Sequence, residues 1–355
     1  MSTKLYMDGT KLNRHVEEVA KWRRGEWFAP LHMELSLTNV CNQKCTFCYT
    51  IWAHGRTQMS TDQVTQLIRS AKSVGVKSTL IAGEGEPTVN PAYVPAIETC
   101  GEVGLDAALN TNAVKMNEEE IVRILPHLSW VRFSVQGSTP ERYAAIHQVP
   151  SHQFHKAMGN IATACRVKKD LGLKVTLGLQ QVLIKENGDD IYETARLARE
   201  LGCDYYVIKP CHPHDLNDKY QTVSNLVETY RDNLKRLETL NTDNFKAIVR
   251  WNFLGEAEIP RSYERCIALP FIVQITADGN VVTCYPHSDK SEHSYGSLHK
   301  EDFADIVKSD KFRSLASQVE HNVDVHKCMP TCRHHNANKY LWWLQEEQPD
   351  HLNFI

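Results

Sequence analysis

Short apolar segments alternate with longer amphipathic segments through most of the chain. The apolar segments repeat with period two or run unbroken for a few residues, and glycine, proline or polar residues bound them, as is typical of buried strands. We expect strands at residues 31–39, 76–82, 105–110, 130–135, 174–183 and 205–209. Helices are expected at 60–73, 91–103, 117–126, 153–169, 189–200 and 226–240, and another begins at 139.

Polar residues mark where several of these helices begin. Ser60 and Gln63 have the spacing of a capping box, and Asn117 suits the N-cap of the helix that follows it. Pro140 takes the first helical position after Thr139. Six strand–helix units between residues 31 and 240 therefore predict an α/β domain with a parallel sheet covered by helices.

Periodicity does not distinguish a partial barrel from a doubly wound sheet. Both architectures place ligand chemistry at the C-terminal ends of the parallel strands. The candidate motifs described below follow predicted strands, so either architecture would bring them to one end of the sheet.

The pattern changes beyond about residue 252. Two alternating runs, 271–276 and 281–284, flank Ala277-Asp278-Gly279-Asn280, and Asp-Gly between such runs predicts a hairpin. An amphipathic helix is expected at 336–345. We expect an N-terminal extension at 1–30 packed on the main domain, the main domain at 31–240, a second domain at 252–346 and a tail at 347–355.

Composition and charge exclude some classes of protein. The chain has 355 residues, 42% of them hydrophobic, with 40 basic against 43 acidic side chains. A net charge of −3 gives no reason to expect a nucleic-acid partner. The N-terminus lacks an apolar signal region and no run approaches the ~18 apolar residues of a membrane span, so we expect a soluble, cytoplasmic protein without a membrane partner.

The eleven cysteines do not read as a disulfide scaffold, because they are odd in number and the chain is long. Seven of them fall into clustered spacings that suit metal sites in a reducing compartment. The apolar surroundings of Cys100, Cys165 and Cys203 predict small core side chains instead.

The first cluster, Cys41, Cys45 and Cys48, has the spacing C-x3-C-x2-C and directly follows the first predicted strand. Three soft thiolates on one loop favour a metal. Zinc would need a fourth protein ligand, whereas an iron–sulfur cubane held by three cysteines leaves one iron open to an outside ligand. A structural zinc knot and three coincidentally buried thiols are the alternatives.

The second cluster surrounds the predicted hairpin. Cys266 precedes the hairpin and Cys284 ends it, at C-x17-C spacing, and Cys328 and Cys332 form a later C-x3-C pair. Together they make a complete four-thiolate site. On ligand chemistry alone, tetrahedral zinc and an iron–sulfur cluster suit it equally well.

The first cysteine spacing, with Phe47 before the third cysteine and a strand before the loop, resembles the radical S-adenosylmethionine (radical SAM) superfamily. The resemblance implies a partial (β/α)6 TIM-like barrel in which the three cysteines hold a [4Fe–4S] cluster and SAM chelates its open iron. Reductive cleavage of SAM then gives a 5′-deoxyadenosyl radical that takes a hydrogen atom from substrate. An electron donor such as flavodoxin or ferredoxin is implied as a partner.

The C-terminal cysteine set resembles the truncated, or twitch, form of the SPASM extension. That likeness implies a small hairpin-plus-helix domain with one auxiliary [4Fe–4S] cluster, as in 2-deoxy-scyllo-inosamine dehydrogenase-like enzymes. Its ligands would be Cys266, Cys284, Cys328 and Cys332.

The resemblance also implies SAM-binding residues at the strand ends. The family's Gly-Gly-Glu-Pro segment matches Gly85, Glu86 and Pro87, but Glu84 stands where the first glycine belongs. Further residues carried over, or expected to face the ligand, are Phe47, Gly83, Asn112, Ser134 and one of the pair Gln180 and Gln181. Ordinary turns and small polar residues at strand ends are the plainer interpretation of each.

Candidate catalytic residues follow the sixth strand. Cys211 is a candidate hydrogen-atom donor to a substrate radical, as in some radical SAM epimerases, and Lys209, His212 or His214 would bind substrate or move a proton. A loop of solvated side chains is the alternative. His334 and His335 are expected to cap a helix or to be solvated.

The sequence thus predicts a radical SAM oxidoreductase or epimerase that acts on a polar small molecule, such as a sugar or aminocyclitol. A maturase of ribosomal peptides is the alternative within the family. A non-catalytic protein with two structural zinc sites is the alternative from another class.

Overall fold

The computed structural model describes residues 5, 7–211, 224–255, 260–329 and 332–354. His212 and His214 lie outside the described residues. Within the described ranges, no helix is both long enough and apolar enough to pass through a membrane.

One curved ten-stranded sheet organises the molecule, in the order β10-β9-β8-β1-β2-β3-β4-β5-β6-β7. Neighbours from β8 through β1 to β7 pair in parallel, and β8-β9 and β9-β10 are antiparallel. The strands are β1 (His32–Leu35), β2 (Ser78–Ile81), β3 (Asp106–Thr111), β4 (Leu128–Ser134), β5 (Thr176–Leu183), β6 (Tyr205–Pro210), β7 (Lys246–Val249), β8 (Ile272–Ile275), β9 (Asn280–Val282) and β10 (Ser294–Ser297).

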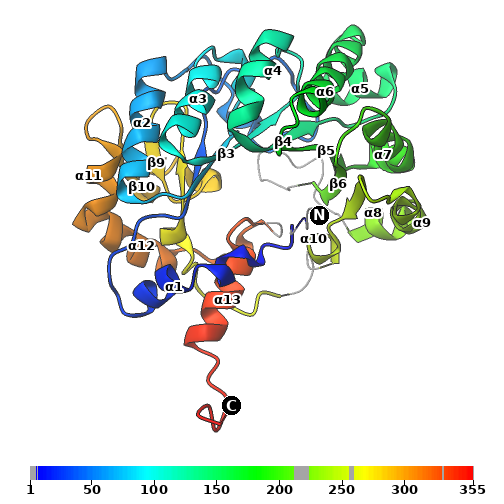
Figure 1. Ribbon diagram of the computed structural model, residues 1–355. Helices are drawn as coiled ribbons and strands as arrows, with labels where there is room; N and C mark the ends of the chain where they lie inside the picture. The colour runs from blue at the N-terminus through cyan, green and yellow to red at the C-terminus, as the bar shows by residue number, and fades with distance from the viewer. Residues whose placement is uncertain (1–4, 6, 212–223, 256–259, 330–331, 355) are drawn as a thin grey trace.

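Helices surround the outside of this sheet (Figure 1). In the barrel they are α2 (Thr61–Val74), α3 (Tyr93–Val103), α4 (Glu118–Ile124), α5 (Pro140–His147), α6 (His152–Asp170), α7 (Ile191–Glu200), α8 (Ser224–Thr229), α9 (Arg231–Arg236) and α10 (Trp251–Gly255). Capping boxes begin α2 at Ser60 and α4 at Asn117, and the Thr139 hydroxyl accepts from Arg142 N at the start of α5. The partial barrel that the sequence predicts is therefore confirmed.

Two features of the barrel differ from expectation. The helix expected at 226–240 is divided into α8, α9 and a 3-10 turn at Leu237–Leu240. A seventh parallel strand, β7, then pairs with β6 beyond the expected domain boundary at 240. The sequence does not reveal this strand, because it has only four residues. Lys246 is exposed and only Ala247 is buried, so no alternation of apolar and polar positions is visible.

The two faces of the strands differ in polarity. In β4, the buried residues Val131 and Phe133 point toward the helices and join the main core, whereas Trp130, Arg132 and Ser134 alternate onto the inner face. The same alternation turns Leu179 outward and Gln180 inward in β5. The inner face is thus available for polar chemistry.

The predicted Asp-Gly hairpin is present as β8 and β9, with Gly279 at φ +80° in the turn. Because β8 also pairs in parallel with β1, the hairpin extends the barrel sheet directly. Across that junction, Gln274 Nε2 donates to Glu34 Oε2 at 2.6 Å on the inner face. The C-terminal domain is therefore joined to the first barrel strand through backbone hydrogen bonds.

The rest of the C-terminal domain comprises α11 (Phe303–Lys308), α12 (Asp310–Asn322) and α13 (His335–Gln345). The N-terminal extension, with α1 (Val16–Arg23), packs mainly on this domain: Val19 and Phe28 share a core with Phe271 and Leu341. An ion pair of Glu18 with Lys77 at 2.6 Å links the extension to the main domain as well.

Candidate iron–sulfur and SAM site

The first three cysteines lie on the loop that follows β1, at the C-terminal end of the barrel. Burial, with smaller contributions from Glu86 and Cys48, raises the pKa of Cys41 to about 12. Burial and the neighbouring Cys48 and Cys41 raise the pKa of Cys45 well above its usual value. Burial likewise raises the pKa of Cys48. Three thiolates this close repel one another unless metal cations compensate them, so this donor set fits an iron–sulfur cluster.

Helix α5 holds the cysteine loop through its last residues. Thr46 N donates to Ile146 O at 2.9 Å and Lys44 N donates to His147 O at 3.2 Å. The buried His147 ring stacks on Tyr143 with centroids 4.0 Å apart, and its Nδ1 lies 3.2 Å from Cys45 Sγ. Sequence reasoning missed this histidine because the thiol and the ring are about a hundred positions apart in the chain.

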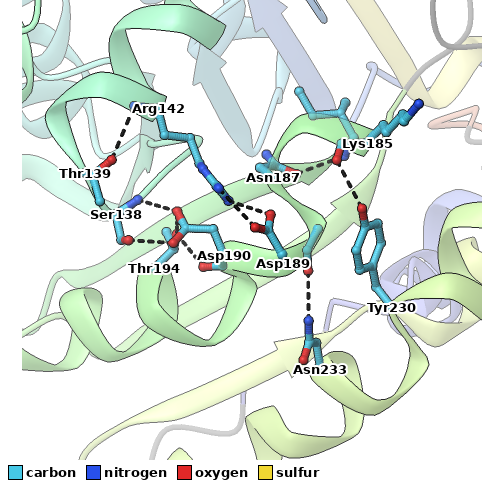
Figure 2. A network of polar contacts seen from close by, with 12 residues as sticks. Ser138, Thr139, Arg142, Lys185, Asn187, Asp189, Asp190, Thr194, Tyr230 and Asn233 are labelled. Atoms are coloured by element: carbon cyan, nitrogen blue, oxygen red, sulfur yellow. Dashed lines mark hydrogen bonds and ion pairs between the residues drawn. The ribbon is translucent and has the colours of Figure 1, made fainter.

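A buried carboxylate holds the beginning of α5 in turn (Figure 2). Asp190 accepts from both the backbone N and the hydroxyl of Ser138 at 2.6 Å, and from the Thr194 hydroxyl at 3.3 Å. The preceding residue, Asp189, forms a two-pronged ion pair with Arg142 at 2.6 and 3.0 Å. The loops after β4 and β5 are therefore tied together beside the cysteine loop.

The glycine-rich segment after β2 lies directly against the cysteine loop. A Cβ on Gly85 would stand 2.3 Å from Val40 O, and Glu86 N donates to that same carbonyl at 3.0 Å. Gly83 has φ +114°, which an L side chain rarely adopts. Both glycines are thus required for the close approach of the two loops. Such a segment would also let backbone groups contact a ligand closely.

The two glutamates of this segment have distinct tasks. Glu86 is buried, and its carboxylate accepts from Thr88, from the Thr111 hydroxyl and from Asn112 N. Glu84, the departure from the family motif, accepts from Ala277 N at 2.7 Å and so binds the segment to the turn between β8 and β9. Burial raises the pKa of both carboxyl groups. The Glu86 side chain therefore connects the glycine-rich segment to the end of β3 through hydrogen bonds.

The other carried-over residues lie around the same strand ends. Asn112 Nδ2 donates to Asn42 Oδ1 of the cysteine loop at 2.8 Å, and Ser134 pairs in register with Gln180. Gln180 is on the inner face, whereas Gln181 is fully buried on the outer side and bonds to Tyr206 OH and Asn187 O. Their contacts with SAM, and that of Phe47, stay predictions.

Lys209 lies near the end of β6, and Cys211 directly follows that strand beside this site. Cys211 is 1% exposed, packs with Ile146, Val182, Ile184 and Phe47, and its thiol lies 3.9 Å from Phe47 O. Lys209 points to the inner face, where burial, Arg250, Arg132 and Arg333 lower its pKa to about 7. The thiol is close to the cysteine loop, and its role as a hydrogen donor stays a prediction.

The four C-terminal cysteines also approach one another. Burial raises the pKa of Cys266 well above its usual value, and Cys332, Cys284 and Cys328 add to that rise. Asn338 Nδ2 donates to Cys266 Sγ at 3.4 Å, while Arg261 donates to Cys328 O at 3.1 Å and to Met329 O at 2.6 Å. Hydrogen bonds from two directions thus shape a four-thiolate site.

The histidine pair after Cys332 is not as expected. His334 is 2% exposed and makes no capping hydrogen bond, and His335 is buried with its Nδ1 3.0 Å from Tyr263 OH. Both rings are packed in the core around the cysteine site because α13 begins there and turns its first residues inward.

Neither cysteine set has the tight convergence of single-ion ligands. Among the described residues, no three histidine, cysteine, aspartate or glutamate side chains could hold one metal ion. The thiols of each set nevertheless lie close enough to raise one another's pKa.

Family comparisons agree with this geometry. Residues 35–198 match the Radical SAM superfamily, and residues 266–334 match the iron–sulfur cluster-binding SPASM domain. The chain carries a radical SAM domain followed by a SPASM domain. The first implies a [4Fe–4S] cluster and SAM, and the second implies auxiliary iron–sulfur ligation.

Curated relatives of this radical SAM–SPASM chain are distant. A tungsten-containing aldehyde ferredoxin oxidoreductase cofactor-modifying protein of Pyrococcus furiosus is 25% identical over 202 residues, which span 53% of this chain and 54% of that protein. The match thus covers about half the length of that relative. GTP 3′,8-cyclase of Aquifex aeolicus is 24% identical over 314 residues, 81% of this chain and 92% of that enzyme.

Solved structures share the fold. Streptococcus suis SuiB bound to S-adenosylmethionine has a TM-score of 0.67 at 18% identity and covers 100% of this chain and 85% of its own. The structure of anSMEcpe with bound AdoMet has a TM-score of 0.57 at 14% identity, with 91% of this chain and 97% of its own covered. At these identities the likeness shows the fold alone.

The radical SAM domain also holds charged residues that the sequence did not single out. Arg132 projects from β4 to the inner face and Arg250 follows β7 on the same side. The charged position between Val131 and Phe133 is a signal that could have identified Arg132. Arg250 had none, since the strand before it was not expected.

Proposed function

We propose that this protein cleaves SAM reductively and uses the 5′-deoxyadenosyl radical to oxidise or epimerise a polar small molecule, such as a sugar or aminocyclitol. The supporting observation is the polar inner face of the barrel. Asn110, Arg132, Ser134, Gln180 and Lys209 alternate inward there, opposite the core residues of the same strands. Hydroxyl-rich ligands match such a surface because its polar groups then keep hydrogen-bond partners.

When bound, the cluster would supply one electron that breaks a carbon–sulfur bond of SAM, giving methionine and the 5′-deoxyadenosyl radical. Cys41, Cys45 and Cys48 would hold this cluster, and Gly83 and Gly85 would let the backbone approach the methionine part of SAM. Transfer of a substrate C–H hydrogen to the radical gives 5′-deoxyadenosine and a substrate radical.

Two outcomes follow from the residues around the substrate radical. In oxidation the radical loses one proton and one electron, and Cys266, Cys284, Cys328 and Cys332 would hold the cluster that accepts that electron. In epimerisation the Cys211 S–H hydrogen is transferred to the opposite face of the carbon. The sulfur radical left on Cys211 then takes up one proton and one electron from the donor, a flavodoxin or ferredoxin.

A peptide substrate is the second candidate. SuiB bound to the precursor peptide SuiA has a TM-score of 0.67 and covers 99% of this chain and 81% of its own. The polar, cationic inner face argues for a small molecule over an apolar peptide segment. The similarity to GTP 3′,8-cyclase makes a nucleotide a third candidate substrate.

Metal analysis of anaerobically purified protein tests the cluster assignment. We expect about eight irons per chain with matching sulfide, which is two cubanes. Zinc without iron would instead support two structural zinc sites and would refute the enzyme proposal.

Activity is tested with SAM and a reductant. Release of 5′-deoxyadenosine establishes the cleavage, and a small molecule that stimulates this release identifies the substrate. Deuterium at a single substrate carbon should move into 5′-deoxyadenosine. If precursor peptides alone stimulate the release, the small-molecule proposal is wrong.

A further inference from the structure

Four cationic side chains gather inside the barrel. They are Arg132 of β4, Lys209 of β6, Arg250 after β7, and Arg333 of the C-terminal domain. After burial, the three arginines lower the pKa of Lys209 to about 7, and Arg132 and Arg333 likewise lower the pKa of Arg250, after burial, to about 10. The four charges therefore lie close enough to repel one another.

The strands place these side chains on one face of the sheet at two levels. Arg132 lies in one row with Gly178 and Tyr205 across β4, β5 and β6, and Lys209 lies four residues farther along β6 on the same face. A Cβ on Gly178 would stand 2.0 Å from the Tyr205 ring, so glycine leaves the space that this ring occupies. Arg250 N donates to Ile208 O at 3.2 Å, which places Arg250 beside Lys209 at the end of the next strand.

Packing fixes the two arginines without neutralising them. Arg132 Nε donates to Tyr205 OH at 3.2 Å, and its guanidinium lies 4.6 Å from the centre of the Trp130 ring. The Arg250 guanidinium lies 3.9 Å from the Phe253 ring centre, and its buried Nε has no hydrogen-bond partner. Within the described ranges neither arginine forms an ion pair, whereas Arg333 is paired with Glu34.

Among the described residues, carboxylates do little to balance the charge of the two arginines. Glu34 is already bonded to Arg333 and to Gln274, and Asp8 is the described acidic group whose charge raises the pKa of Arg250. Holding like charges together in a half-buried site destabilises the empty protein, and a bound anion would reverse that cost. Guanidinium forks also match the oxygens of a phosphate in pairs.

We propose that Arg132, Lys209 and Arg250 bind a phosphate group of the substrate. The inference rests on the proposed function and narrows its substrate class to phosphorylated small molecules, a sugar phosphate or a nucleotide-linked sugar. A free aminocyclitol, whose ammonium groups these cations would repel, does not fit the site.

Anion binding can be measured without turnover. The cluster-loaded protein is heated in sodium sulfate or sodium phosphate and in sodium chloride of equal ionic strength. We expect a higher Tm in sulfate and phosphate, and an apparent Kd at least about tenfold weaker in Arg132→Met and Arg250→Met, because each loses one charge-assisted contact. Arg199→Met, an exposed arginine on α7, is the matched control and should behave as the wild type.

An equal Tm shift in wild type and in both variants would mean an adventitious ion only and would overturn the proposal, as would no shift in the wild type. If a methionine variant is not folded by circular dichroism, Arg250→Gln replaces it, since it also removes the charge and keeps a polar side chain.

The two proposals fail in different ways. Cleavage of SAM without substrate reports the proposed function, and it is measured in the wild type and in the Arg199→Met control. Pairs of sugars with and without phosphate, and of nucleotide-linked sugars, are then compared for stimulated 5′-deoxyadenosine release. Stimulation by the unphosphorylated members alone, or by peptides alone, overturns the phosphate site while leaving SAM cleavage intact.

Discussion

Nδ1 of His147 lies 3.2 Å from Cys45 Sγ and 2.8 Å from Gln43 Oε1. Burial lowers the pKa of this ring to about 3, so it is neutral and its Nδ1 carries at most one proton to share between the two partners. A hydrogen bond to a cluster thiolate raises the reduction potential of an iron–sulfur cluster. We therefore predict that His147 positions and tunes the cluster that Cys45 would hold.

Replacing His147 with Phe should lower the potential of that cluster, or loosen its iron, while the new ring keeps the stacking on Tyr143. Redox titration followed by electron paramagnetic resonance and iron content per chain measure the two effects. His155→Phe, on the exposed face of α6, is the control. An unchanged potential with full iron content would show that the ring serves packing alone.

The auxiliary site can be removed separately from the catalytic one. Cys284→Ala with Cys328→Ala should reduce iron from about eight to about four atoms per chain, because two thiolates do not retain a cubane. SAM cleavage without substrate should continue in this variant, and substrate oxidation should stop. Retention of all eight irons would refute the assignment of these ligands.

Glu84 tests the junction of the two domains. Its carboxylate accepts from Ala277 N at 2.7 Å, so Glu84→Ala should lower the free energy of unfolding by about 1–3 kcal/mol by leaving that N–H unsatisfied. Chemical denaturation measures the loss. Glu84→Gln retains an acceptor oxygen and should remain near the wild type; equal losses in both variants would show that the charge, and not the hydrogen bond, matters.

The neighbouring residues Asp189 and Asp190 provide a matched comparison of an exposed and a buried contact. Asp190→Ala should cost about 2–4 kcal/mol of stability because the backbone N–H and the hydroxyl of Ser138 lose their carboxylate acceptor in a buried site. Asp189 pairs with Arg142 at the surface, with 66% of its side chain exposed, so Asp189→Ala should cost at most about 1 kcal/mol. Comparable losses would mean that the network in Figure 2 does not hold α5 in place.

Local signals in the sequence were sufficient for much of this architecture. Ser60 and Asn117 begin helices as predicted, and the Asp278-Gly279 turn forms its hairpin, because short-range hydrogen bonds determine these features. The cysteine spacings likewise grouped thiols that the structure brings near one another, and their role as cluster ligands stays a prediction. The helix starts, the turn and the first cysteine set each depend on residues that are near one another in the chain.

Long-range contacts explain what was missed. Pairing of β8 with β1 and the Glu84 contact to Ala277 each join segments about 190 to 240 positions apart, which periodicity cannot show. The burial of His334 and His335 depends on how α13 packs, and Arg250 becomes meaningful only once β7 is known to join the sheet. Tertiary pairing, and not local preference, determines these positions.

The charge on Lys209 should make anion binding depend on pH. Burial, followed by Arg250, Arg132 and Arg333, lowers its pKa to about 7, and the nearby Cys211 opposes that shift. As the pH rises through 7, the free site loses one positive charge. Sulfate keeps its two charges over this range, so its affinity should fall steadily between pH 6 and pH 8 by up to about tenfold. Titrations at fixed ionic strength measure this, and Lys209→Met should bind sulfate more weakly at pH 6 with little further change up to pH 8. A wild-type affinity that stays constant, or a Lys209→Met profile as steep as that of the wild type, would assign the site to the two arginines alone.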